Sequence, residues 1–325
     1  MTAANILSAT SENIVTAARL VNEGKLVAFP TETVYGLGAD ATNDEAVASV
    51  FSAKARPTFN PLIIHFKDMD AAARAVTFNE RAERLAGAIW PGSLTLVLPR
   101  RPECEISLLA AAGLDSLAVR VPGDDVALTL LREAGCPLTA PSANRSGDVS
   151  PTTAAHVAES LGDAVEVILD GGPSRVGIES AIVDLTDETT VVLRPGAVAM
   201  KNIEALAGPV ASACAAPCAG PPASGRKASF AARHYTTGLP LRLNVAEAQL
   251  GEAFLAFGPD AREGDAAHML NLSPAGDFRE AAANLFSMLH ELDSPEYYSI
   301  AVMPIPEDGL GRAINDRLRR VAGHS

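Results

Sequence analysis

A short segment of this sequence combines a lysine, an arginine and an asparagine with two prolines. Lys54, Arg56 and Asn60 lie close together, and Pro57 and Pro61 stiffen the chain around them. Ammonium, guanidinium and amide groups held in this way suit a phosphate-rich ligand, whose oxygens accept several hydrogen bonds. The alternative interpretation is that Lys54 and Arg56 only close a helix, where cations interact favourably with the helix dipole.

Two arginines lie in or beside apolar, strand-like runs. Arg120 is flanked by Val119 and Val121, and Arg194 follows the run that ends at Leu193. Burying an arginine is costly unless the charge is paired. Arg120 therefore either has a carboxylate partner within the protein or meets an anionic ligand, and the sequence leaves both possibilities open.

Hydroxyl and amide side chains gather in further segments, at residues 30–36, 139–152 and 177–180. Such side chains can line a polar site, although the second segment also fits a turn followed by the N-cap of a helix near Thr152. No Ser-His-Asp pattern, phosphate-binding P-loop or zinc-ligand spacing accompanies them. The residue types alone predict a cleft for an anionic ligand, with a nucleotide as the favoured class.

These segments interrupt an alternation of strand-like and helix-like runs, which predicts an α/β domain with a mixed sheet. The expected strands are residues 25–29, 62–66, 95–98, 117–121, 165–169, 181–185 and 190–193. Expected helices begin near residues 43, 79, 124 and 152. The polar segments would then lie where the chain leaves these strands.

Composition divides the chain into three parts. Residues 1–207 hold the alternation just described, and residues 208–239 begin with a stretch rich in Ala, Pro, Gly and Ser that is typical of a linker. Residues 240–325 repeat the alternation on a smaller scale, with a clear helical period after Asp277. We therefore expect a large site-bearing domain, a linker and a small C-terminal α/β domain of the βαβ type.

The overall composition excludes several classes of protein. The chain has 325 residues, a net charge of −13 and four cysteines, and acidic residues outnumber basic ones on both sides of residue 207. This balance argues against a protein that coats nucleic acid nonspecifically. No apolar run reaches the roughly 20 residues of a membrane span, and the first residues lack a signal-peptide pattern. With so few cysteines, the expected location is the cytoplasm.

Taken in order, these segments resemble the YrdC-type family in its long two-domain form, the threonylcarbamoyl-AMP synthases. The shared elements are the opening signature FPTETVYGLG at residues 29–38, the K-x-R element at Lys54 and Arg56, the N-P-L-I-x-H run at residues 60–65 and the S-x-N element at Ser142 and Asn144. The resemblance is strong up to residue 207 and looser beyond it.

The resemblance implies a twisted mixed sheet with helices and a central cavity, followed by a smaller Rossmann-like C-terminal α/β domain. It implies a nucleotidyltransferase that makes threonylcarbamoyl-AMP from L-threonine, bicarbonate or CO₂, and ATP, releasing pyrophosphate. Mg²⁺ would arrive on the ATP phosphates rather than on protein ligands. The product would pass to a separate tRNA threonylcarbamoyl transferase complex for t⁶A37 modification, so neither direct tRNA binding nor a membrane is required.

The resemblance also assigns roles to individual residues. Those expected to hold threonine are Thr33, His65, Arg120, Ala140 and Ser180. Those expected to contact ATP are Arg56, Asn60, Ser116, Ser142, Ser150, Arg194 and Tyr235. Those expected near the phosphates and the reacting carbamate are Lys54, Arg56, Ser142 and Asn144. Arg120 would pair with the carboxylate of threonine, and Tyr235 would reach over the nucleotide from a linker that acts as a lid.

One departure and two alternatives accompany the resemblance. The linker departs from the family pattern K-H-Y-x-P, because it contains Arg233-His234-Tyr235 with no proline closely following, so a more mobile lid is expected.

A YrdC-type protein that binds double-stranded RNA or ribosomes without synthase activity would need a basic face, which the acidic first domain disfavours. A carbamoyl-adenylate enzyme like the YrdC-type module of hydrogenase maturation proteins would carry zinc-finger-like and acylphosphatase-like segments, which are missing here. Without the resemblance, His65 would be interpreted as a structural histidine.

Overall fold

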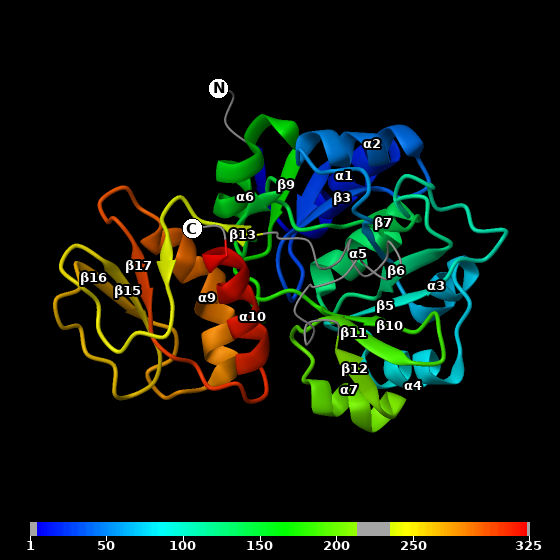
Figure 1. The fold of residues 1–325 in the computed structure, drawn as a ribbon. Coiled ribbons are helices and arrows are strands. Elements are labelled where there is room, and N and C mark those ends of the chain that lie inside the picture. The colour runs from blue at the N-terminus through cyan, green and yellow to red at the C-terminus, as the bar shows by residue number, and fades with distance from the viewer. Residues whose placement is uncertain (1–4, 213–234, 324–325) are drawn as a thin grey trace.

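The computed structural model describes residues 5–212 and 235–323 of the chain. The predicted linker between residues 213 and 234, with Arg233 and His234, lies outside these described residues. The described chain forms a large α/β domain, on the right in Figure 1, and a smaller α/β domain on the left.

The large domain is built on one eleven-stranded sheet with the order β1-β9-β2-β3-β7-β4-β6-β5-β10-β11-β12. Its strands are β1 (Ile6–Ser8), β2 (Val27–Phe29), β3 (Gly36–Asp40), β4 (Ile63–His65), β5 (Leu94–Pro99), β6 (Ser116–Arg120), β7 (Leu138–Thr139), β9 (Val167–Asp170), β10 (Ala181–Asp184), β11 (Thr190–Arg194) and β12 (Val210–Ser212). The sheet is mixed, as predicted, because β4 pairs in parallel with β6 while β5 pairs antiparallel with β6. β12 continues the sheet in parallel beside β11, although composition had predicted that the linker begins before it.

Helices flank this sheet. They are α1 (Ser11–Asn22), α2 (Asp44–Ala53), α3 (Met69–Ala75), α4 (Glu80–Ile89), α5 (Asp125–Ala134), α6 (Ala154–Leu161) and α7 (Met200–Ala207), with a 3-10 turn at Gly162–Ala164. The predicted starts of α2, α4 and α5 are confirmed, because the side chains of Asn43, Asn79 and Asp124 cap the first free backbone N–H groups.

The sheet separates two apolar cores. On β2, Ala28 packs in the core shared with α2, α4, α6 and α7, whereas Val27 and Phe29 pack in the core shared with α1 and α5. This is the alternation that a strand imposes on its side chains. Strands β4, β6, β5, β10 and β11 carry a small apolar cluster on the sheet face that α1 and α5 cover elsewhere. This cluster includes Ala118 and Ile182. The pocket described below lies over that part of the sheet.

The small domain has a parallel four-stranded sheet of order β14-β17-β15-β16. Its elements are β14 (Leu241–Arg242), β15 (Ala253–Ala256), β16 (His268–Asn271), α9 (Phe278–Leu292), β17 (Ile300–Val302) and α10 (Gly311–Ala322). The predicted cap at Asp277 is confirmed, because its Oδ1 accepts hydrogen bonds from the backbone of Arg279 and Glu280. Helices α9 and α10 lie between the small sheet and the large domain (Figure 1).

The two domains share an apolar core. Val34, Val149 and Ile178 of the large domain belong to the same cluster as the buried face of α9. Gly177 permits this contact, because a Cβ atom there would lie 2.5 Å from the carbonyl oxygen of Ala282 on α9. At the start of the second described range, β13 (Tyr235–Thr236) pairs in parallel with β8 (Gly147–Asp148) of the large domain.

Within the described residues, no helix combines the length and apolar composition that crossing a bilayer requires.

Candidate active site

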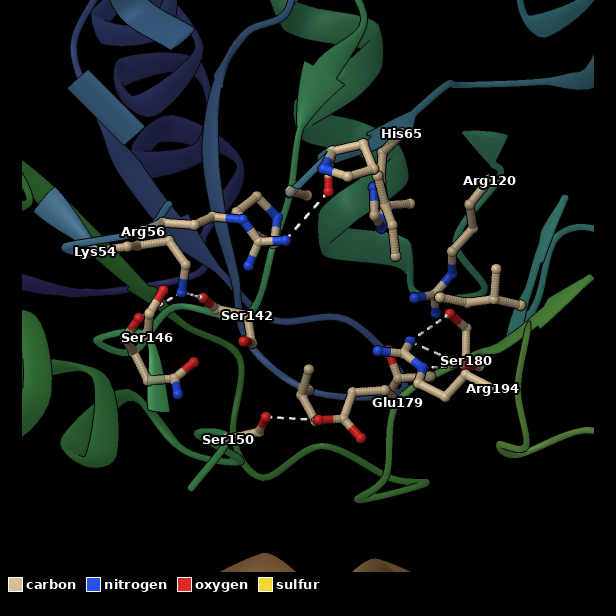
Figure 2. A pocket seen from close by; sticks show the side chains of 18 of the residues that line it. Lys54, Arg56, His65, Arg120, Ser142, Ser146, Ser150, Glu179, Ser180 and Arg194 are labelled. Atoms are coloured by element: carbon tan, nitrogen blue, oxygen red, sulfur yellow. Dashed lines mark hydrogen bonds between the residues drawn. The ribbon is translucent and has the colours of Figure 1, made fainter. Parts of the chain in front are cut away.

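Alternate residues of two strands, β4 and β10, form the floor of the pocket, and β6 and β5 lie between these strands in the sheet. Pro61, Ile63 and His65 line it from β4 and the residues before it, and Ser180 and Ile182 line it from the start of β10. Alternate residues of a strand point to the same face of a sheet. Because β4 and β6 are parallel and in register, with His65 opposite Arg120, both of these side chains lie at one end of the pocket (Figure 2).

Lys54 ties two loops of the pocket together. Its Nζ donates to the carbonyl oxygen of Ser142 at 2.5 Å and also to that of Asn144, and its own carbonyl accepts from the backbone of Ser146 at 2.7 Å. Burial, reinforced by the charge of Arg56, holds the pKa of the Lys54 ammonium well below its usual range. The lysine therefore fixes the loop that carries Ser142 and Asn144.

Two arginines approach the pocket from opposite walls (Figure 2). Arg56 Nη2 donates to the carbonyl of Pro61 at 3.1 Å, and Arg194 Nη2 donates to the carbonyl of Ser180 at 3.0 Å. Burial and the neighbouring charge of Arg194 lower the pKa of Arg56 to about 10. A pair of cations that repel each other across a pocket makes a site for an anion, even in a chain of net charge −13.

Arg120 has a carboxylate partner, which answers the question that the sequence left open. Its Nη2 lies 2.6 Å from Glu32 Oε1, and both side chains are buried, at 4% and 3% exposure. Burial alone would raise the pKa of Glu32, but the charge and hydrogen bond of Arg120 keep it below its usual value. Ser93 Oγ donates to the same oxygen at 3.0 Å. Arg120 nevertheless lines the pocket, so it is held by Glu32 while facing a ligand.

His65 is a buried imidazole whose Nδ1 has no hydrogen-bond partner among the described residues. Burial, followed by the positive charge of Arg120, lowers its pKa well below the usual range. The ring is therefore neutral at pH 7. A neutral imidazole at the wall of a pocket can accept a proton or a hydrogen bond from a ligand.

Ser150 and Glu179 form the remaining polar wall. Ser150 Oγ donates to Glu179 Oε1 at 2.6 Å (Figure 2). Glu179 is the only carboxylate among the described residues that line the pocket, and Arg317 of α10 also binds it, at 2.9 Å. No group of three or more His, Cys, Asp or Glu side chains in the described parts of the chain could hold a metal ion.

The structure brings most of the predicted site residues together in this one pocket. They are Thr33, Lys54, Arg56, His65, Arg120, Ala140, Ser142, Asn144, Ser150, Ser180 and Arg194. The side chains of Asn60 and Ser116 are buried close to β4 and β6, and neither belongs to the described lining. The side chain of Tyr235 lies outside the described part of the structure, and its backbone pairs with Gly147 at the rim.

Sequence reasoning assigned no role to three residues that shape this site. Glu32 lies inside the opening signature but is far from Arg120 in the sequence, so the sequence predicted a possible carboxylate partner for Arg120 without identifying which one. Glu179 lies in a polar segment that was singled out, but without a role for the carboxylate. Arg317 lies in a helix with several other arginines, but it is three residues after Ile314 and four before Val321. This spacing puts it on the apolar face of the helix, which was an available signal.

Comparison with known proteins assigns the chain to a family. Residues 19–196 match the Sua5/YciO/YrdC family model, which carries the description "Telomere recombination", and residues 198–323 match "Threonylcarbamoyl-AMP synthase, C-terminal domain". The threonylcarbamoyl-AMP synthase of Bacillus subtilis is 38% identical over 329 residues, with coverage of 98% of this chain and 95% of the relative. The protein of that name from Pyrococcus abyssi is 39% identical over 333 residues, with coverage of 95% and 93%.

A solved structure supports the same assignment. The crystal structure of P. abyssi Sua5 complexed with L-threonine matches with a TM-score of 0.86 and 35% identity, covering 98% of this chain and 97% of that one. The similarity extends over both domains, which fits the two consecutive family matches. The chain therefore belongs to the two-domain threonylcarbamoyl-AMP synthase family.

Proposed function

We propose that this protein makes threonylcarbamoyl-AMP from L-threonine, bicarbonate or CO₂, and ATP. The observation that carries the proposal is the combination of two kinds of site in one pocket. A neutral imidazole and a neutralised arginine lie side by side at the ends of β4 and β6. Arg56 and Arg194 approach from the walls, where they donate to the backbone carbonyls of Pro61 and Ser180. The first pair suits an amino acid and the second suits the phosphates of a nucleotide.

Threonine would bind at the ends of β4 and β6. Arg120 would hold its carboxylate, with Glu32 fixing the guanidinium in place. His65, which is neutral and lines the pocket, would accept a hydrogen bond from the amino group. Thr33 and Ser180, which also line this pocket, supply hydroxyl groups for the side chain of threonine.

ATP would bind towards Arg56 and Arg194. These cations would neutralise the phosphates, while Ser142 and Ser150 would donate hydroxyl hydrogen bonds. Mg²⁺ fits the pocket as an ion carried in by ATP, because the only described lining carboxylate, Glu179, is already bound by Ser150 and Arg317. When bound, the ion would neutralise the charge of the leaving pyrophosphate.

This reaction depends more on the positioning of threonine, CO₂ and ATP than on a nucleophilic side chain of the protein. The amino group of threonine and CO₂ form a carbamate, and a proton leaves the nitrogen. A carbamate oxygen then forms a bond to the α-phosphorus of ATP, and the bond from that phosphorus to the bridging oxygen breaks, releasing pyrophosphate. Lining residues that hold the two reactants and neutralise charge would supply most of the rate enhancement. The product would serve a separate transferase that modifies tRNA.

The test is mass spectrometry of the protein incubated with ATP, Mg²⁺, bicarbonate and L-threonine. A threonylcarbamoyl-AMP peak with stoichiometric pyrophosphate, absent when threonine or bicarbonate is omitted, is the expected result. Pyrophosphate without that adduct would indicate another amino-acid acceptor. If ATP binds but no product forms, the proposal is wrong, and RNA binding that weakens with salt becomes the next measurement.

A further inference from the structure

A side chain of the small domain reaches the wall of the pocket in the large domain. Arg317 lies on α10 and is fully buried. Its Nε lies 2.9 Å from Glu179 Oε2, and its Nη1 donates to the carbonyl of Pro195 at 2.8 Å. Both acceptors belong to the large domain, on the two segments that carry the pocket residues Ser180 and Arg194.

The contact continues through Glu179 to Ser150. While Oε2 of Glu179 binds Arg317, Oε1 accepts the hydrogen bond from Ser150 Oγ at 2.6 Å. A second residue of the small domain contacts the same segment, because His290 Nε2 on α9 lies 3.3 Å from the carbonyl oxygen of Ser150. The segment around Ser150 is therefore fixed from the small domain at both its side chain and its backbone.

The ion pair between Arg317 and Glu179 also affects the charge of the pocket. Glu179 places a buried carboxylate in a pocket whose other charged walls suit phosphates, and an unpaired carboxylate there would repel ATP. Arg317 neutralises it without lining the pocket itself. Arg317 also binds Asp316, which in turn pairs with Arg320 at 2.8 Å. Removal of Arg317 takes one positive charge away from this cluster and so makes the wall beside the nucleotide more negative.

We propose that Arg317 is a positioning residue by which the small domain controls ATP binding in the large domain. It neutralises Glu179 and holds that carboxylate where Ser150 is oriented towards the nucleotide. This inference rests on the proposed function, because it assumes that ATP binds beside Ser150. It gives the small domain a defined contribution to the reaction, since ATP affinity then depends on the docking of α10.

The experiment compares Arg317→Met, the double variant Arg317→Met/Glu179→Gln and the control Arg319→Met. Arg319 lies on the same helix but is exposed and pairs with Glu307 on the surface. In Arg317→Met, we expect the KM for ATP to rise about tenfold while kcat and the KM for threonine stay within about twofold. In the double variant the excess charge is gone, so the KM for ATP should return to within about threefold of the wild-type value. Arg319→Met should match the wild type.

A purely structural role for Arg317 gives a different result. It would lower thermal stability and the fraction of active protein without changing the KM for ATP, and Glu179→Gln would bring no recovery. Either observation overturns the proposal. If Arg317→Met does not fold, Arg317→Lys, which keeps the charge, should bind ATP with an affinity close to that of the wild type in calorimetry, and a loss of about tenfold or more there would also overturn it. Failure of the proposed function is separate, because the wild-type protein would then form no adduct.

Discussion

The cations of the pocket are held mainly by backbone carbonyl oxygens. Lys54 donates to the carbonyls of Ser142 and Asn144, Arg56 to those of Asn60 and Pro61, and Arg194 to that of Ser180. A carbonyl carries only a partial charge, so it orients a cation without neutralising it. Among the described contacts, Arg56 donates only to carbonyl oxygens, so its positive charge is available to an anionic ligand. Arg120 differs from these cations, because its partner is the Glu32 carboxylate. It can therefore orient a ligand through hydrogen bonds, but it adds little net positive charge to the pocket.

The first residue-scale prediction concerns Arg56. Arg56→Ala should raise the dissociation constant for ATP about tenfold to a hundredfold, because a hydrogen bond to a charged group contributes about 1.5–3 kcal/mol. The affinity for threonine should change little, since Arg120 and His65 stay in place. Isothermal titration calorimetry with each substrate measures both, with the exposed Arg19→Ala as the control. Equal losses for the two substrates would show that Arg56 supports the whole pocket instead.

The second residue-scale prediction concerns the pH dependence of stability. His65 has a pKa in the folded protein well below its usual 6.5, so below pH 6.5 the unfolded state binds the extra proton. The free energy of unfolding that this residue contributes is complete above pH 6.5 and falls as the pH drops below it. One such group changes the slope by up to about 1.4 kcal/mol per pH unit. Urea unfolding at pH 7.5, 6.5 and 5.5 should give a shallower decline for His65→Asn than for the wild type, and parallel declines would contradict the assignment.

At the scale of elements, the close approach of two turns sets the position of the strand residues. Gly196 packs directly on the backbone before β10, where a Cβ atom would lie 2.3 Å from the Ala181 nitrogen and 2.5 Å from the Glu179 oxygen. Because backbone atoms cannot give way cheaply, Gly196→Ala must push apart the segments that carry Ser180 and Arg194. The pocket therefore depends on a glycine that touches no ligand.

Two glycine-to-alanine substitutions, one at this close contact and one at an exposed helical position, test the effect of this packing on stability. Gly196→Ala should lower the free energy of unfolding by about 3 kcal/mol. Gly87→Ala should raise it by about 0.5–1 kcal/mol, because Gly87 lies in the exposed part of α4 and a Cβ atom there would meet no other atom within 4 Å. Chemical denaturation of both variants measures the difference. Two variants of equal stability would show that the turns can separate without cost.

The sequence predicted the elements whose pattern is local. The N-caps Asn43, Asn79 and Asp124 and the apolar period after Asp277 were sufficient, because each involves residues within one or two turns. Short strands such as β7, with two residues, and β12, after a composition typical of a linker, carry no such pattern and exist through their sheet partners. The same limit applies in the pocket. The Arg317–Glu179 pair joins residues that are far apart in sequence, and no local spacing encodes it.

At the scale of the whole molecule, we expect the two domains to unfold together, because they share one apolar core. Ile178 is fully buried in the cluster that the large domain shares with α9. Ile178→Ala should cost about 2–5 kcal/mol and should weaken the docking of the small domain. Differential scanning calorimetry should then show a transition that broadens or splits in two. Ile203→Ala, which removes an equally buried isoleucine from the core of the large domain, should lower the transition temperature without splitting the transition.

The shared register of β4 and β6 limits how this family can change its substrate. His65 lies opposite Arg120 because Ile63 lies opposite Ala118. One inserted residue in either strand would turn the last side chain to the other face, into the core with α2 and α4. Evolution can therefore alter the amino acid that this pocket accepts by exchanging residues at fixed strand positions, but not by lengthening the strands. Variation in length is left to the loops for which we propose phosphate binding.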